Sequence, residues 1–144
     1  RSWQKPLSLF VKNLEMANAV AQIDKNQEKF LKKFCPGQTI AIFFAKKRFP
    51  AGIVSVSGKI GLRIPDHPVI RHLLSVINSP LVQTSANISG ESSTNKIKDV
   101  LRQFTPRSRS DEGPDLILDA GKLKSKKPSR VIDLTSKKPK IISE

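Results

Sequence analysis

Two short stretches combine residue types that could bind an anion. In residues 59–64, Lys59, Gly61 and Arg63 alternate with three aliphatic residues, so a strand would place both cations on one face, with little bulk between them. A guanidinium on that face would suit a carboxylate or a phosphate, because its N–H groups form a planar fork. The alternative is an edge strand whose charged face is solvated, and the residues alone leave both interpretations open.

The second stretch, Thr84-Ser85-Ala86-Asn87, follows the short apolar run Leu81-Val82, which predicts a buried strand. Hydroxyl and backbone N–H groups at the exit of a strand can donate to phosphate oxygens. In open α/β sheets, ligands bind in the crevice beyond the strand ends. Neither familiar glycine-rich phosphate loop occurs in the sequence, so an ordinary polar loop is the alternative.

The sequence gives little support for a disulfide, a metal site or acid–base catalysis. Cys35 is the single cysteine, which excludes an intrachain disulfide and favours a small buried apolar residue. His67 and His72 lack partners at metal-ligand spacing, so we expect no metal site made of protein side chains. No paired carboxylates indicate acid–base catalysis, and we expect turn or surface positions for Asp115, Asp119 and Asp133.

Composition narrows the class of protein. The chain has 144 residues, which suits one domain with a core, and its net charge is +14, from 26 Lys and Arg against 12 Asp and Glu. This charge favours anionic partners such as nucleotides or RNA, although the lysines of residues 122–144 could equally form a solvated surface. No apolar run approaches the roughly 20 residues that span a bilayer. No secretory signal opens the sequence, and the single cysteine favours a reducing compartment, so we expect a cytoplasmic protein.

Hydrophobic periodicity predicts alternating strands and helices, and therefore an α/β sandwich around one twisted sheet. The expected strands are residues 7–11, 39–44, 59–64, 81–83, 116–118 and 131–132, and the expected helices are residues 14–21, 26–34, 68–77 and 95–104. Residues 39–44 are apolar on both faces, which predicts a strand inside the sheet. The helix that begins near Pro68 should bury one side, made of Val69, Ile70, Leu73, Leu74 and Ile77. Residues 136–144 could form a terminal strand or a frayed tail.

Six segments in this order resemble the YrdC-like family along nearly the whole chain: KPLSLFV, CPGQTIAIFF, GLRIPDHPVI, PLVQTSANISG, DLILDAG and PSRVIDLT. The most specific are residues 62–68 and 84–90. The resemblance implies a twisted open mixed sheet with helices packed on it and a positively charged cavity. It implies one domain over residues 1–135, followed by a basic tail, residues 136–144. The family's first portion, a strand with a Pro-Thr-Glu-Thr-x-Tyr-Gly-like motif and the helix after it, is not among these residues, so we expect the domain to be incomplete at its start.

For function, the resemblance implies an L-threonylcarbamoyladenylate synthase. Such an enzyme makes threonylcarbamoyl-AMP and pyrophosphate from L-threonine, bicarbonate and ATP, with Mg²⁺ accompanying the ATP. The product serves threonylcarbamoyladenosine modification of tRNA, through a downstream transfer machinery. The alternative is a noncatalytic family member that binds double-stranded RNA or tRNA, or a translation or ribosome maturation factor.

The resemblance also assigns residues to two subsites. The expected ATP-binding residues are Arg1, Lys59, Ser85, Asn87 and Ser93, and the expected L-threonine-binding residues are Arg63, Thr84 and Ser129. No residue is expected to act as a covalent catalyst, since adenylyl transfer requires only that two anions be brought together and their repulsion be screened. The family's Pro-Ser-Thr motif appears here as Pro128-Ser129-Arg130, which places an extra cation beside Ser129.

Overall fold

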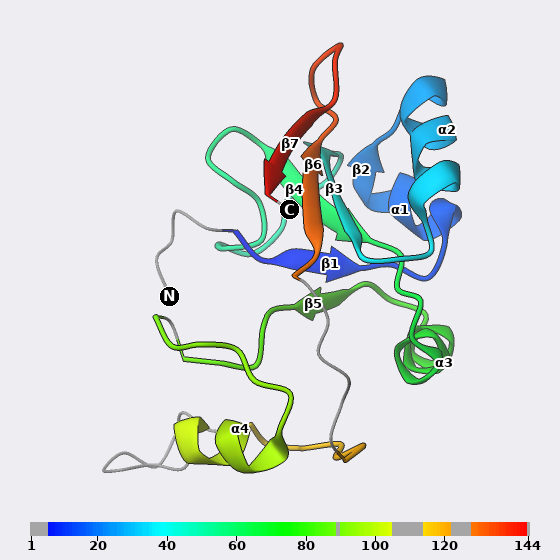
Figure 1. Ribbon diagram of the computed structural model, residues 1–144. Helices are drawn as coiled ribbons and strands as arrows, with labels where there is room; N and C mark the ends of the chain where they lie inside the picture. Colours follow the sequence, from blue (N-terminus) through cyan, green and yellow to red (C-terminus); the bar gives the residue numbers. More distant parts are fainter. Residues whose placement is uncertain (1–5, 89, 105–113, 122–127, 144) are drawn as a thin grey trace. The chain divides into compact units, whose positions relative to one another are not determined.

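The computed structural model describes residues 6–88, 90–104, 114–121 and 128–143. Its helices are α1 (Leu14–Val20), α2 (Lys25–Phe34), α3 (Pro68–Ile77) and α4 (Ile97–Phe104). Its strands are β1 (Ser8–Phe10), β2 (Ala21–Gln22), β3 (Thr39–Ala45), β4 (Lys59–Arg63), β5 (Leu81–Gln83), β6 (Arg130–Asp133) and β7 (Lys140–Ser143). The expected α/β fold with helices on one open, mixed sheet is confirmed (Figure 1).

The strands form one sheet in the order β5-β1-β4-β3-β6-β7, and β2 pairs separately with β3. The β1–β4 and β3–β6 pairs are parallel, and the other pairs are antiparallel. The chain divides into two compact units, residues 1–84 with 128–144, and residues 85–127. All the strands belong to the first unit, and α4 belongs to the second.

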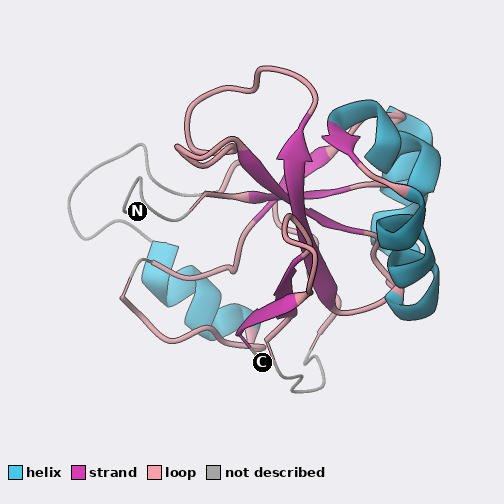
Figure 2. Ribbon diagram, turned by 90° about the horizontal axis from the view of Figure 1, so that it is seen from above, coloured by secondary structure: helices cyan, strands magenta, loops and turns pink. Residues whose placement is uncertain are grey.

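The strand register gives the sheet two different faces. Leu9, Leu62, Ala41 and Ile132 lie in one row across four strands, and each is almost completely buried. Helices α1 and α2 lie together on that side (Figures 1 and 2), and their buried residues join the same core. Because side chains alternate along a strand, the neighbouring residues of β1, β3, β4 and β6 point to the other face, which we call the site face. Its members include Phe10, Ser8, Gly61, Arg63, Lys59, Ile42 and Asp133.

Local capping explains where the helices of the first unit begin. Asn13 accepts a hydrogen bond from the backbone N–H of Met16 at the start of α1. Asp24 and Gln27 form a reciprocal capping box at the start of α2. Pro68 is the first residue of α3, where its missing N–H costs nothing.

Two predictions about the central strands are confirmed. Strand β3 lies inside the sheet, and β4 lies between β1 and β3. Ile60 and Leu62 are buried on the helix-covered face, while Lys59 and Arg63 are half-buried on the site face. The solvated edge strand is therefore the wrong interpretation of residues 59–64.

Other predictions are wrong or are decided by the structure. Strand β5 is not a buried strand but the edge of the sheet, and Val82 is 51% exposed. Residues 116–118 form no strand and are exposed. Ala21 does not continue α1 but starts β2. The chain's last described residues are ordered as β7 rather than frayed.

Helix α3 buries much less than its apolar pattern predicts. Leu74 is fully buried, but Val69, Leu73 and Ile77 are between 37% and 50% exposed. Periodicity reports that a helix has an apolar side, and it cannot report whether another element covers that side. No helix in the described ranges is long and apolar enough to cross a membrane.

Candidate functional site

Arg63, the last residue of β4, is held in a fixed position by two chain segments. Its Nε donates to the Gly37 carbonyl oxygen at 2.8 Å, and its Nη1 donates to Ser129 Oγ, also at 2.8 Å. The guanidinium lies over the ring of Phe10, with Cζ 5.5 Å from the ring centroid. Partial burial lowers the pKa of Arg63, but an arginine stays protonated at any physiological pH.

The guanidinium keeps unused hydrogen-bonding capacity. Of its five N–H groups, two make the bonds to Gly37 and Ser129, and no contact within the described ranges uses the other three. Ser129 accepts the bond from Arg63 on its oxygen, so its own O–H remains able to donate. Arg63 and Ser129 together thus present several donors to one anion, and the structure brings together two residues that were predicted to bind threonine.

Gly37 is placed by the segment that ends α2. Its backbone N–H donates to the Ile64 carbonyl at 3.0 Å, which ties this segment to the end of β4. A Cβ atom at Gly37 would lie 3.0 Å from the carbonyl oxygen of Phe34, a tight contact that would require the backbone to shift by a few tenths of an ångström. A glycine here therefore lets the carbonyl of residue 37 reach Arg63.

Gly61 has a different role from the one its small size suggested. The expectation was empty space beside Arg63. In the structure, an added Cβ would lie 3.1 Å from Cγ2 of Ile40 and 3.2 Å from Cβ of Ser8. The space is occupied by these neighbours, so Gly61 permits close packing between β3, β4 and β1.

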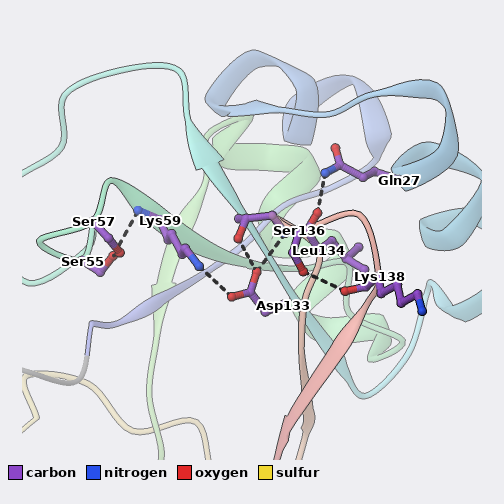
Figure 3. A network of polar contacts seen from close by, with 9 residues as sticks. Gln27, Ser55, Ser57, Lys59, Asp133, Leu134, Ser136 and Lys138 are labelled. Carbon is purple, nitrogen blue, oxygen red and sulfur yellow. Dashed lines mark hydrogen bonds and ion pairs between the residues drawn. The ribbon is translucent and has the colours of Figure 1, made fainter.

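Lys59, an expected ATP-binding residue, is paired within the sheet. Figure 3 shows Lys59 and Asp133 pointing toward each other, and Nζ lies 2.8 Å from Oδ2. Asp133 also accepts from the N–H and the hydroxyl of Thr135, at 2.8 and 2.6 Å. The Lys59 ammonium lies 6.0 Å from the centroid of the Phe44 ring. The ATP role of Lys59 stays a prediction, because no ligand tests it.

Asp133 is a correction to the sequence analysis, which placed it in a turn or on the surface. It lies in β6, and its side chain is only 14% exposed. Burial alone would raise the pKa of this carboxyl, but hydrogen bonds from Lys59 and Thr135 and the charge of Lys59 lower it overall. At the next residue, the Leu134 carbonyl accepts a hydrogen bond from Gln27 Nε2 at 2.6 Å, which connects α2 to the end of β6 (Figure 3).

The expected nucleotide loop lies mostly in the second unit. Ser85 and Ser93 are exposed. Asn87 Nδ2 donates to the carbonyl oxygens of Ile88 at 3.0 Å and Glu91 at 2.7 Å, so the carboxamide closes the loop on itself. Its Oδ1 is buried and accepts no hydrogen bond from the described chain. Asn87 thus holds the loop through its amide nitrogen, while its buried oxygen has no partner among the described residues.

The remaining predicted residues are less informative. Thr84 is exposed and follows β5, and Arg1 lies outside the described residues. Sequence reasoning missed Phe10 and Gly37 as supports of Arg63. Phe10 lies beside Arg63 because β1 and β4 pair in parallel, and no pattern in the sequence predicts that pairing.

A metal site was not expected from protein side chains. Within the described ranges, no three or more His, Cys, Asp or Glu side chains cluster in a way that could hold a metal ion.

The structure is thus an α/β protein with a mixed sheet, and its site face carries a partly buried guanidinium braced by a carbonyl and a hydroxyl. The chain belongs to the Sua5/YciO/YrdC family, whose family model, described as "Telomere recombination", matches residues 1–144.

Individual relatives support the same assignment. A protein of Methanocaldococcus jannaschii is 35% identical over 140 residues, which are 96% of this chain and 61% of that protein. The threonylcarbamoyl-AMP synthase of Dichelobacter nodosus is 34% identical over 100 residues, 69% of this chain and 48% of that protein. The crystal structure of P. abyssi Sua5 complexed with L-threonine superposes with a TM-score of 0.85 at 26% identity, covering 99% of this chain and 40% of that one. The chain thus spans about three-fifths or less of the length of these proteins.

Proposed function

We propose that this chain acts as, or as part of, an L-threonylcarbamoyladenylate synthase, which forms threonylcarbamoyl-AMP and pyrophosphate from L-threonine, bicarbonate and ATP. The observation that carries the proposal is the hydrogen bond between Arg63 and Ser129, which presents a fork of donors on the site face. Similarity to a threonylcarbamoyl-AMP synthase and to a Sua5 protein complexed with L-threonine supports it.

In this proposal Arg63 holds the carboxylate of threonine. Three N–H groups of the guanidinium are unused by the described chain, and two of them suffice for a bidentate pair with a carboxylate. The bond from Arg63 occupies the oxygen of Ser129, which leaves the Ser129 proton to donate to the same ligand. Phe10 and Gly37 act as positioning residues, because they fix the plane of the guanidinium. Thr84 completes this subsite.

The residues proposed to bind ATP are Ser85, Asn87 and Ser93 in the second unit, and the cations Arg1 and Lys59 in the first. The two serine hydroxyls donate to phosphate oxygens, and Asn87 positions the loop through its bonds to the Ile88 and Glu91 carbonyls. Lys59 has two N–H groups beyond the one it directs at Asp133, and these reach toward phosphate.

The chemistry requires positioning and charge neutralisation more than a reactive side chain. The threonine amine and bicarbonate form a carbamate with loss of water, a carbamate oxygen attacks the α-phosphorus of ATP, and pyrophosphate leaves. Both reactants are anions, so the cations of the two subsites lower their repulsion. Mg²⁺ bound to the triphosphate would supply further neutralisation. The product would then be passed to the machinery that modifies tRNA.

The experiment is a pyrophosphate-release assay on the full chain with ATP, L-threonine and bicarbonate. We expect release that needs both threonine and bicarbonate, and that falls at least 100-fold in Arg63→Ala but not in Arg48→Ala, which removes an exposed arginine of a turn. Release that is equal with and without L-threonine would refute the proposal.

A second candidate function is RNA binding without synthesis, and the net charge of +14 favours it. RNA affinity should then fall steeply with salt, because phosphate contacts release counterions, and L-threonine should not change it. Salt-dependent RNA binding together with no threonine-dependent pyrophosphate release would select this function over the synthase.

A further inference from the structure

A cavity in the first unit is lined by residues of α1, α2 and α3 and by none of the residues of the site face. Its volume is about 260 Å³. Leu14 of α1, Leu31 of α2, Pro36 and Ile64 form its apolar wall, and Leu31 is itself part of the buried core. Arg63 does not line it. Neither the proposed synthesis nor the RNA alternative uses this cavity.

Three cations surround the apolar wall. They are Lys12 at the end of β1, Lys32 in the last turn of α2, and Arg71 on α3. No acidic side chain is among the residues that line the cavity, all of which the structure describes. The lining therefore carries three positive charges beside a hydrocarbon surface, which matches an anion attached to an apolar body.

The three cations differ in how available they are. Lys32 forms an ion pair with Glu28 at 2.8 Å, and it also faces the partial negative charge at the end of α2. Lys12 directs one N–H to Asn78 Oδ1 at 2.9 Å, which leaves two. Arg71 is exposed, and its guanidinium forms no hydrogen bond or ion pair with the described residues. Arg71 is therefore the main candidate to receive the anionic group.

We propose that this cavity binds a small organic carboxylate with a compact apolar body, such as one aromatic ring. The ring occupies the wall formed by Leu14, Leu31 and Ile64, and the carboxylate pairs with Arg71 and Lys12. The size agrees, because about 260 Å³ lies just below the roughly 300–1,000 Å³ of drug-sized pockets.

Cys35 provides a built-in reporter, since it lines the cavity and is the chain's single cysteine. Burial raises the pKa of its thiol, and the smaller opposing effects of a hydrogen bond with the Ile64 backbone and the charge of Arg63 do not cancel that rise. The thiol is therefore mostly neutral at pH 7, and its alkylation is slow enough to time. A ligand in the cavity should protect it.

The experiment compares benzoate with benzamide, its uncharged counterpart, on the full chain. Binding is measured by backbone amide shifts of Leu14, Ile64 and Arg71 and by the rate at which iodoacetamide alkylates Cys35. We expect benzoate to bind at least tenfold more tightly than benzamide, because only benzoate pairs with the cations. Benzoate should slow alkylation at concentrations at which L-threonine does not.

A charge variant and a matched control separate this site from general attraction to a basic protein. Arg71→Gln should weaken benzoate about tenfold and leave benzamide unchanged, whereas Arg48→Gln, at an exposed turn, should change neither. Equal affinities for benzoate and benzamide, or amide shifts confined to residues outside the cavity, would overturn the proposal. So would inorganic phosphate that binds the cavity as tightly as benzoate, because the apolar wall would then contribute nothing.

Discussion

Replacement of Arg63 by alanine should remove most of the affinity for L-threonine while the protein stays folded. The guanidinium has three N–H groups with no partner in the described chain, and a carboxylate would take two of them. A charge-assisted hydrogen bond contributes about 1.5–3 kcal/mol, so two of them amount to roughly 3–6 kcal/mol. Since about 1.4 kcal/mol is a tenfold change, the dissociation constant should rise at least 100-fold.

The same substitution should cost stability only modestly. It removes the bonds to the Gly37 carbonyl and to Ser129, which we expect to destabilise the protein by about 1–3 kcal/mol. Isothermal titration with L-threonine gives the affinity, and urea unfolding of the same samples confirms that each variant is folded. Arg63→Lys keeps the charge but cannot reach both supports, so it should lose about tenfold.

Two controls make this test decisive. Arg48→Ala removes an arginine from an exposed turn and should leave threonine affinity unchanged. Ser129→Ala keeps the guanidinium but loses one brace and one donor, so a loss of about three- to tenfold is expected. If folded Arg63→Ala bound threonine within twofold of the unaltered protein, the carboxylate role of Arg63 would be wrong.

Three further predictions concern stability. The lowered pKa of Asp133 means that its ionised form stabilises the fold above the unfolded-state pKa of about 3.9, and that this contribution is lost as the pH falls through the folded-state value. As the pH is lowered from 6 to 3, the urea unfolding midpoint should fall less in Asp133→Asn and in Lys59→Met than in the unaltered protein. Variants with the same pH dependence as the unaltered protein would contradict the pairing of Lys59 with Asp133. Gly61→Ala should destabilise by about 1–3 kcal/mol, because its Cβ would press on Ile40 at 3.1 Å, and a neutral result in thermal unfolding would mean that β3 and β4 can separate without cost. Asp24→Ala removes the capping box of α2 and should cost about 1 kcal/mol in urea unfolding, with a cost near zero arguing that the helix start is held by packing alone.

Local sequence patterns predicted the elements on which the candidate site depends. Alternation in residues 59–64 placed Lys59 and Arg63 on one face, and the structure has them so. The apolar run of residues 39–44 predicted an interior strand, which β3 is. These predictions succeed because a strand buried between two others must be apolar where it packs, so its pattern records its surroundings.

Apolar patterns predicted burial wrongly where no described element covers the apolar residues. Residues 116–118 are as apolar as a strand, yet no described strand pairs with them and they are exposed. Helix α3 has an apolar side that stays largely uncovered. A short apolar run predicts burial only if another element comes to cover it, which the run itself cannot specify.

The sequence by itself determined the class of fold, the order of most strands and helices, and the positive charge that favours an anionic ligand. Only the tertiary structure decided which groups support Arg63. Its partners are Gly37, 26 residues away, and Ser129, 66 residues away. The pairing of Lys59 with Asp133 likewise spans 74 residues. Contacts over such distances arise from the parallel placement of β6 beside β3 and of β1 beside β4, and strand order leaves no periodic trace in the sequence.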